Sequence, residues 1–274
     1  MTRKSISAAS GNVVYYVSDD WTGGRNTLVF LHGLTGDHTM FEQQFEYFGG
    51  KYNIIAWDAP AHGESRPFAD FTYQKAAEAL KQILDETGVA SAVLAGQSMG
   101  GFISQSFIKR YPERARAFIG IDTTPFGDGY YSKSDIFWLK RVEPLAKLYP
   151  LGAMKKAMAK QVSVTEKGYK NMLAMLEPYG KEELCRLMGI GYAAFLEDNC
   201  DLKIPCPVLI ILGEKDSTGK VKSYCKEWAK RTGYPLKIIK NAAHNSNVDN
   251  PDEVNIAIEK FIKKIGGHHE NNDN

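Results

Sequence analysis

Short apolar runs that recur between helix-like segments are the feature of this sequence that most restricts its fold. Several of these runs are apolar at every position and not at alternating ones, which indicates strands buried on both faces. Such strands are typical of a parallel sheet covered by helices on both sides. The predicted fold class is therefore α/β with a mostly parallel, twisted sheet. The runs begin at Asn12, Thr27, Asn53, Ser91, Ala117, Pro207 and Pro235.

The segments between the runs carry the spacing of amphipathic helices. Within residues 72–87, apolar or small side chains recur every three or four positions, and Gly88 can end that helix in a left-handed conformation. Another helix is predicted after Asn250, which would be its N-cap. Pro251 then occupies the first helical position and Glu253 completes a pattern similar to a capping box.

The alternation of strands and helices is interrupted once, at residues 126–202. This stretch contains no convincing strand and reads as short amphipathic helices broken at prolines. We therefore expect a helical insertion between two strands of one sheet. The expected organisation is a core domain of residues 1–125 and 203–266, the insertion, and a disordered tail of residues 267–274 that lacks core-forming side chains.

Composition and charge exclude several kinds of partner. The chain has 274 residues with 34 Lys and Arg against 32 Asp and Glu, so no basic excess indicates nucleic acid. No apolar run is long enough to span a bilayer, and the amino terminus lacks the apolar segment of a secretory signal. The four cysteines have no metal-binding spacing and are expected to be reduced thiols. These features predict a cytoplasmic protein with no nucleic-acid or membrane partner.

Ser98 is a polar residue at the point where an apolar run ends and a helical pattern begins. Residues 96–100 read Gly-Gln-Ser-Met-Gly and match G-x-S-x-G, the sharp turn that exposes a nucleophilic serine between a strand and a helix. Glycines two positions to either side are needed because neighbouring elements leave no room for side chains there. With a strand before it and a helix after it, Ser98 is predicted to be a nucleophile.

A serine hydroxyl needs a base to take its proton and a carboxylate to orient that base. His244 is the single histidine between Ser98 and the tail, and it follows a predicted strand. That position lies on the carboxyl edge of the sheet, where open α/β sheets bind ligands. For the acid, Asp216 follows another strand and a glycine turn on the same edge. Asp122 also follows a strand and competes for this role, although Asp216 is favoured.

Acyl transfer also requires backbone N–H groups aimed at the developing oxyanion. Residues 32–36 read His-Gly-Leu-Thr-Gly after a predicted strand. Gly33 would let this loop approach the nucleophile, so that the N–H of Leu34 points inward. The N–H of Met99, at the start of the next helix, is the second predicted donor. His32 is assigned a structural role because it precedes the serine in a loop-packing position.

Together these motifs resemble the α/β-hydrolase superfamily, specifically its serine members with a helical cap, such as carboxylesterases and proline iminopeptidases. The resemblance covers nearly the whole chain. It includes residues 58–65, which are similar to the D-x-P-G-H-G-x-S loop except that Ala61 replaces a glycine. Haloalkane dehalogenases carry an aspartate in place of Ser98. A pyruvate-eliminating synthase of menaquinone formation has similar motifs but typically an arginine where Phe102 stands.

The resemblance implies an α/β-hydrolase fold in which residues 126–202 form the cap. It also implies hydrolysis of an ester or related acyl bond of a small molecule through an acyl-enzyme, with no metal and no organic cofactor. A lactonase, an aminopeptidase or an elimination enzyme could use the same residues, and a non-catalytic binding module on this fold is the alternative from another class. The implied site consists of Ser98, Asp216 and His244 as catalytic triad, with Leu34 and Met99 as oxyanion donors.

Overall fold

An eight-stranded sheet forms the centre of the protein. The computed structural model describes residues 1–267. The strand order is β1-β2-β4-β3-β5-β6-β7-β8, and every neighbouring pair is parallel except β1 with β2 and β2 with β4. The predicted fold class, α/β with a mostly parallel sheet, is confirmed. The strands are β1 (Thr2–Ala8), β2 (Gly11–Val17), β3 (Thr27–Leu31), β4 (Asn53–Trp57), β5 (Ala92–Gln97), β6 (Ala115–Ile121), β7 (Val208–Gly213) and β8 (Leu236–Ile239).

Seven of these strands coincide with the apolar runs of the sequence, whereas β1 was missed. Strand β1 lies at the edge of the sheet, and Ile6 is the single side chain in it that is buried. The exposed positions carry polar and charged residues such as Arg3 and Lys4, which are common on edge strands because they discourage further pairing. An edge strand of this kind has no apolar periodicity from which it could be predicted.

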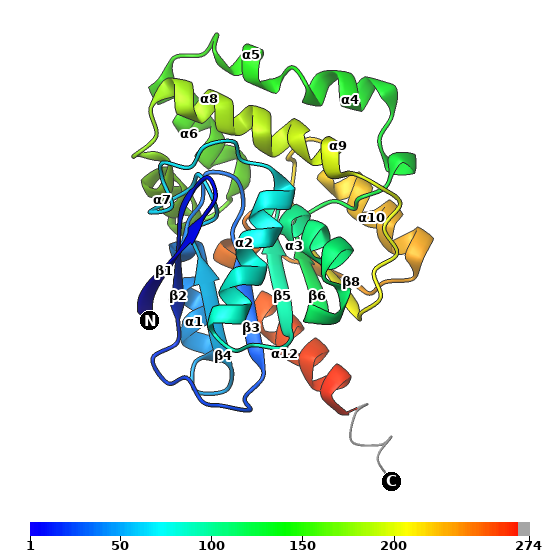
Figure 1. The fold of residues 1–274 in the computed structure, drawn as a ribbon. Helices are drawn as coiled ribbons and strands as arrows, with labels where there is room; N and C mark the ends of the chain where they lie inside the picture. The colour runs from blue at the N-terminus through cyan, green and yellow to red at the C-terminus, as the bar shows by residue number, and fades with distance from the viewer. Residues whose placement is uncertain (268–274) are drawn as a thin grey trace.

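Helices cover both faces of the sheet (Figure 1). Helices α2 and α3 pack together on one face, and α1 and α12 pack together on the other. The predicted ends of α2 and α12 are confirmed, since Gly88 has a φ of 68° and the Asn250 side chain accepts the N–H of Glu253 at 3.3 Å. The helices outside the segment between β6 and β7 are η1 (His38–Phe41), α1 (Glu42–Phe48), α2 (Tyr73–Glu86), α3 (Met99–Arg110), η2 (Pro112–Arg114), α10 (Val221–Thr232), α11 (Ser246–Asp249) and α12 (Pro251–Gly267).

Between β6 and β7 the chain forms helices and no strand. Figure 1 shows most of these helices gathered above one end of the sheet, with α4 and α5 outermost. Helix α5 packs on α8, and α6 packs on α7. The elements are η3 (Asp128–Tyr130), α4 (Lys133–Leu139), α5 (Val142–Ala146), α6 (Leu151–Val162), α7 (Glu166–Leu176), α8 (Lys181–Gly189), the π-helical turn η4 (Ile190–Ala194) and α9 (Phe195–Asp198).

Three further sequence predictions concern features outside the sheet. Among residues 1–267, no helix is long and apolar enough to cross a membrane. All four cysteines are free thiols. The predicted disordered tail of residues 267–274 lies outside the described part of the chain, apart from Gly267, with which α12 ends.

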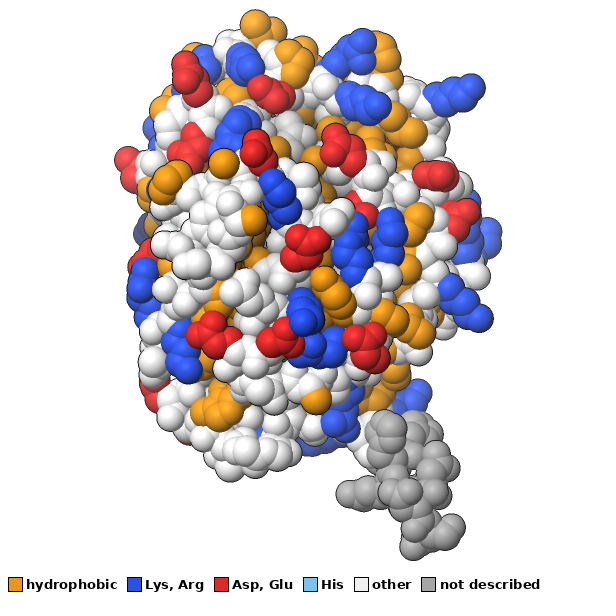
Figure 2. All heavy atoms as spheres, viewed as in Figure 1, with side chains coloured by type: hydrophobic (Ala, Val, Ile, Leu, Met, Phe, Trp, Pro, Cys, Tyr) orange, Lys and Arg blue, Asp and Glu red, His pale blue; other side chains and the backbone are white. Residues whose placement is uncertain are grey.

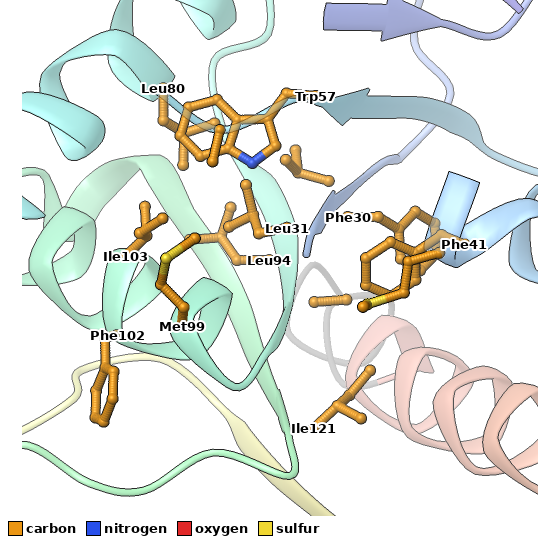
Figure 3. Close-up of a cluster of buried hydrophobic side chains, with 14 of the residues drawn as sticks. Phe30, Leu31, Phe41, Trp57, Leu80, Leu94, Met99, Phe102, Ile103 and Ile121 are labelled. Carbon is orange, nitrogen blue, oxygen red and sulfur yellow. The ribbon is translucent and has the colours of Figure 1, made fainter. Parts of the chain in front are cut away.

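The junction between β5 and α3 is packed so tightly that it leaves no room for a side chain at the start of the helix. Figure 3 shows Leu31, Leu94, Met99 and Ile103 gathered between α3 and the strands. A Cβ atom on Gly100 would overlap the carbonyl oxygen of Leu31, so the first turn of α3 rests directly on the backbone of β3. This contact fixes where the helix begins relative to the sheet.

We expect Gly100→Ala to destabilise the fold because backbone would have to move to accept the added methyl group. Overpacking of this kind lowers the free energy of unfolding by roughly 1–3 kcal/mol. Gly152→Ala in α6 is the matched control, since nothing lies within 4 Å of its Cβ position, and it should be neutral or stabilising by up to about 1 kcal/mol. Urea denaturation of both variants measures the difference, and equal stabilities would contradict the close contact.

Candidate active site

Ser98 lies on the sharp turn between β5 and α3, as the sequence predicts. Its backbone has φ 49° and ψ −112°, a sparsely populated region for a residue with a side chain. Hydrogen bonds to the end of β6 and the residues after it help to hold it there. The Ser98 N–H donates to the carbonyl of Ile121 at 2.9 Å, and the hydroxyl of Thr123 donates to the Ser98 carbonyl at 2.7 Å. The turn therefore presents the Ser98 hydroxyl at the carboxyl end of β5.

His244 lies between two of the predicted site residues and hydrogen-bonds to both. Its Nε2 atom is 2.9 Å from Ser98 Oγ, and its Nδ1 atom is 2.9 Å from Asp216 Oδ2. His244 follows β8, Ser98 follows β5 and Asp216 follows β7. The three residues therefore meet at the carboxyl edge of the sheet. The imidazole and the carboxylate are both buried, whereas Ser98 is half-buried. The arrangement allows a proton to pass from the serine hydroxyl to the imidazole.

Asp122 lies nearby but does not hydrogen-bond to the imidazole. Its carboxylate accepts the N–H of Gly213 at 2.6 Å and the N–H of Ser246 at 3.1 Å. Asp216, in contrast, accepts from His244 and also from the N–H of Thr218, at 2.8 Å. Of the two acids considered from the sequence, the structure therefore joins Asp216 to the histidine and gives Asp122 backbone partners.

Burial and neighbouring charge shift the pKa values of both Asp122 and His244. Burial and the neighbouring charge of Asp216 raise the pKa of Asp122 to about 7. For His244, burial alone would lower the pKa, but the charge of Asp216 and its hydrogen bond outweigh burial and raise the pKa above 6.5. An imidazolium at this position is thus stabilised mainly by Asp216.

The loop that carries His244 is held by residues that sequence reasoning did not single out. The Gln97 side chain donates to the His244 carbonyl at 2.8 Å. Asp249 accepts the N–H of Ala243 at 2.9 Å and the hydroxyl of Thr165 at 2.7 Å, which ties the loop to the start of α7. Gln97 had a signal, because it is a polar residue in an otherwise apolar strand. Asp249 had no such signal, because its partners Ala243 and Thr165 lie far from each other in the sequence.

The two predicted N–H donors both lie beside Ser98. Met99 is the first residue of α3, so its N–H has no carbonyl partner within the helix. Leu34 follows Gly33, where an added Cβ would lie 3.2 Å from the Cβ of Ser98. Leu34, Ser98 and Met99 all line the same cavity. A carbonyl oxygen bound near Ser98 could therefore face these two residues.

His32 and His62 are buried and serve the packing of loops. The Nε2 atom of His32 accepts the N–H of Ala59 at 2.9 Å, and its Nδ1 atom is 2.7 Å from the carbonyl of Gly33. His62 Nδ1 lies 2.9 Å from the carbonyl of Pro60, and burial lowers its pKa to about 3. His32 thus joins the loop after β3 to the loop after β4, His62 bonds within its own loop and packs on His32, and neither hydrogen-bonds to Ser98.

A cavity of about 740 Å³ opens above Ser98 and His244 and is lined mainly by apolar side chains. Its walls come from the loops of the sheet edge, from α3 and α10, and from helices α4 to α9. Lys220 is the single Lys or Arg among the lining residues, and it is paired with Asp135 at 2.6 Å. Within residues 1–267, no cluster of three or more His, Cys, Asp or Glu side chains is placed to hold a metal ion.

Comparison with known proteins gives a consistent family. The model of the alpha/beta hydrolase fold family matches residues 26–179. The 3-oxoadipate enol-lactonase 2 of Acinetobacter baylyi is 24% identical over 258 residues, covering 88% of this chain and 90% of that protein. The dihydrolipoyllysine-residue acetyltransferase component of the acetoin cleaving system of Cupriavidus necator is 32% identical over 111 residues, but the match spans 40% of this chain and 30% of that protein. A thermophilic esterase of Thermogutta terrifontis, solved with malate bound, has a TM-score of 0.78 at 22% identity over 97% of this chain and 99% of that chain.

The pKa of His244 provides a direct test of which carboxylate faces it. Asp216→Asn should lower this pKa because the imidazolium loses the negative charge that stabilises it most. Asp122→Asn should lower it less, since that carboxylate contributes less and makes no hydrogen bond to the ring. Titration of the histidine resonances by NMR gives both values. A larger fall in Asp122→Asn would reverse the assignment.

Proposed function

This chain belongs to the family of the alpha/beta hydrolase fold, and on that basis we propose that it is a serine hydrolase that cleaves an ester or related acyl bond of a small molecule. The observation that carries the proposal is the pair of 2.9 Å contacts that joins Ser98 Oγ to His244 Nε2 and His244 Nδ1 to Asp216 Oδ2. A nucleophile, its base and an orienting acid in this order are the groups that acyl transfer requires.

The reaction would proceed through a covalent acyl-enzyme. His244 Nε2 takes the proton of Ser98 while Oγ attacks the substrate carbonyl carbon, whose oxygen gains the negative charge. The N–H groups of Leu34 and Met99 stabilise this oxyanion, and Asp216 stabilises the imidazolium. The leaving alcohol takes the proton from His244 as its bond to carbon breaks. Water, activated by the same imidazole, then attacks the acyl group and releases the acid and free Ser98.

The cavity favours neutral substrates with apolar groups. The helices between β6 and β7 would act as the cap and supply much of the apolar wall. Lys220 is already paired with Asp135, so a substrate with several carboxylates would lack a free cation in the cavity. Asp135 and Asp122 are likewise engaged, which leaves no free anionic clamp for the amine of a peptide substrate. Ester cleavage is therefore preferred over peptidase activity.

A lactonase is the second candidate. A lactone is a cyclic ester, and the same attack by Ser98 would open it. The similarity to an enol-lactonase over 88% of this chain supports this candidate. Adipate, in the name of that enzyme, is a dicarboxylate, whereas the apolar cavity of this chain suits an uncharged ring. We therefore expect any lactone substrate to be neutral.

Ser98→Ala should abolish hydrolysis of short p-nitrophenyl esters because no other hydroxyl in the described part of the chain is hydrogen-bonded to His244. Ser91→Ala, at an exposed serine just before β5, is the matched control and should keep full activity. A fluorophosphonate probe should label the wild-type protein and the control but not Ser98→Ala. Circular dichroism confirms that each variant is folded. Full turnover in Ser98→Ala, or no labelling of a folded wild type, would refute the proposal and favour a binding module.

Asp216→Asn should lower kcat/KM by about 10³- to 10⁴-fold, since the imidazole loses both its orientation and the charge that stabilises it. Asp122→Asn should cost less than about tenfold, because it disturbs backbone contacts and leaves the Asp216 bond in place. Steady-state kinetics on the same ester measures both losses. If Asp122→Asn were the more damaging change, the acid role would pass to that residue.

A further inference from the structure

Helices α4 and α5 and the turn that follows them expose an unusual number of large apolar side chains. Eight large hydrophobic residues are exposed in the described part of the chain, and five of them lie here. Leu148 is the most exposed, at 78%. We call these five residues the α4–α5 patch; they are Phe137, Trp138, Leu145, Leu148 and Tyr149. Apolar residues scattered singly over a surface are ordinary, but a contiguous group indicates a contact surface.

Positive charge is concentrated around the same patch. Residues 133–160 contain two carboxylates and seven Lys or Arg, six of them exposed and only Lys155 buried, whereas the whole chain has a formal net charge of +2. Both carboxylates are already paired, Asp135 with Lys220 and Glu143 with Lys147. Figure 2 shows hydrophobic and basic side chains next to each other along the top of the molecule, where Figure 1 places α4 and α5.

The patch is continuous with the cavity above Ser98. Trp138, Leu145 and Tyr149 belong to the patch and also line the cavity. The exposed residues Ala157 and Gln161 of α6 line the cavity as well. The cavity therefore opens to the outside between the patch and α6, and whatever contacts the patch lies at its entrance.

In place of the sequence-based expectation of no membrane partner, we propose that the α4–α5 patch docks on an anionic phospholipid surface, with its apolar side chains in the interface and the neighbouring lysines over the headgroups. Exposed aromatic and aliphatic residues flanked by basic residues are typical of segments that lie in a membrane interface without crossing it. Anionic lipids attract such basic segments. A second copy of this chain suits the patch less well, because a symmetric contact would bring two positively charged surfaces together.

Docking would bring the entrance of the cavity to the lipid surface. The docking, together with the proposed hydrolase function on which this step rests, identifies the substrates as neutral esters carried in a lipid layer. An apolar ester could then move from the layer past Trp138 and Tyr149 toward Ser98 without crossing water. The docking itself does not depend on the chemistry at Ser98.

The test is binding of the full chain to vesicles of phosphatidylcholine, with and without phosphatidylglycerol. We expect binding to the anionic vesicles, weakened by salt, and little binding to phosphatidylcholine alone. Leu148→Glu should lower the affinity about tenfold or more, because it places a negative charge in the interface. Ile256→Glu is the matched control, since Ile256 is exposed on α12 at 45%, and it should bind as the wild type does.

A second pair of variants tests the charge alone. Replacing Lys140, Lys156 and Lys160 by glutamine should lower the affinity for anionic vesicles about tenfold or more. The matched control replaces Lys4, Lys260 and Lys264, which are also exposed but lie away from the patch, and it should change the affinity little. Equal losses in the two triple variants would mean that net charge, and not the patch, attracts the protein, and would overturn the proposal.

Two further measurements separate docking from catalysis and from self-association. Ser98→Ala should bind vesicles normally, and Leu148→Glu, which lies outside the cavity lining, should keep its kcat/KM for a water-soluble ester. Vesicle binding would therefore survive even if the proposed chemistry at Ser98 failed. Absent binding, equal binding to both lipid compositions, or a dimer in sedimentation that Leu148→Glu dissociates would each overturn the proposal.

Discussion

The contact between the backbone of α3 and the backbone of β3 is the constraint on which the rest of the site depends. No side chain separates them at Gly100, so the helix begins immediately after the strand and the serine between them adopts a positive φ. A conformation of this kind costs about 1–3 kcal/mol. The cost is offset by the buried core under the turn, where Leu94, Met99 and Ile103 are almost fully enclosed. The rigid core thus holds the proposed nucleophile in a position that a flexible loop could not maintain.

A second constraint acts on the histidine. Its loop connects β8 to α11, yet it is held largely by elements from elsewhere in the chain, including Gln97 of β5 and the segment that joins α6 to α7. The N–H of Asn245 donates to the carbonyl of Val162 at 2.8 Å, and Asp249 accepts from Thr165. The position of the imidazole therefore depends on the inserted helices as well as on the sheet.

The sequence predicts much of this arrangement because the relevant signals are local. A buried strand such as Thr27–Leu31 is apolar throughout, and a turn such as the one at Ser98 requires glycines at fixed positions. The edge strand Thr2–Ala8 escaped prediction because solvent covers most of it. Local sequence signals alone also do not decide between Asp122 and Asp216. Both follow parallel strands, and only the folded loops after β6, β7 and β8 bring Asp216 to the ring and Asp122 to backbone N–H groups.

The network around Asp249 has a consequence for how new specificities can arise on this scaffold. Helices α6 and α7 are tied to the histidine loop, so changes there would move His244 along with the wall of the cavity. Helices α4 and α5 share no such bond with that loop among residues 1–267, and they form one wall of the cavity. The helices between β6 and β7 therefore differ in how closely they are tied to His244: α6 and α7 are bonded to its loop, whereas, in the described part of the chain, α4 and α5 are not. Substitutions in α4 and α5 can therefore reshape one wall of the cavity while the imidazole keeps its position.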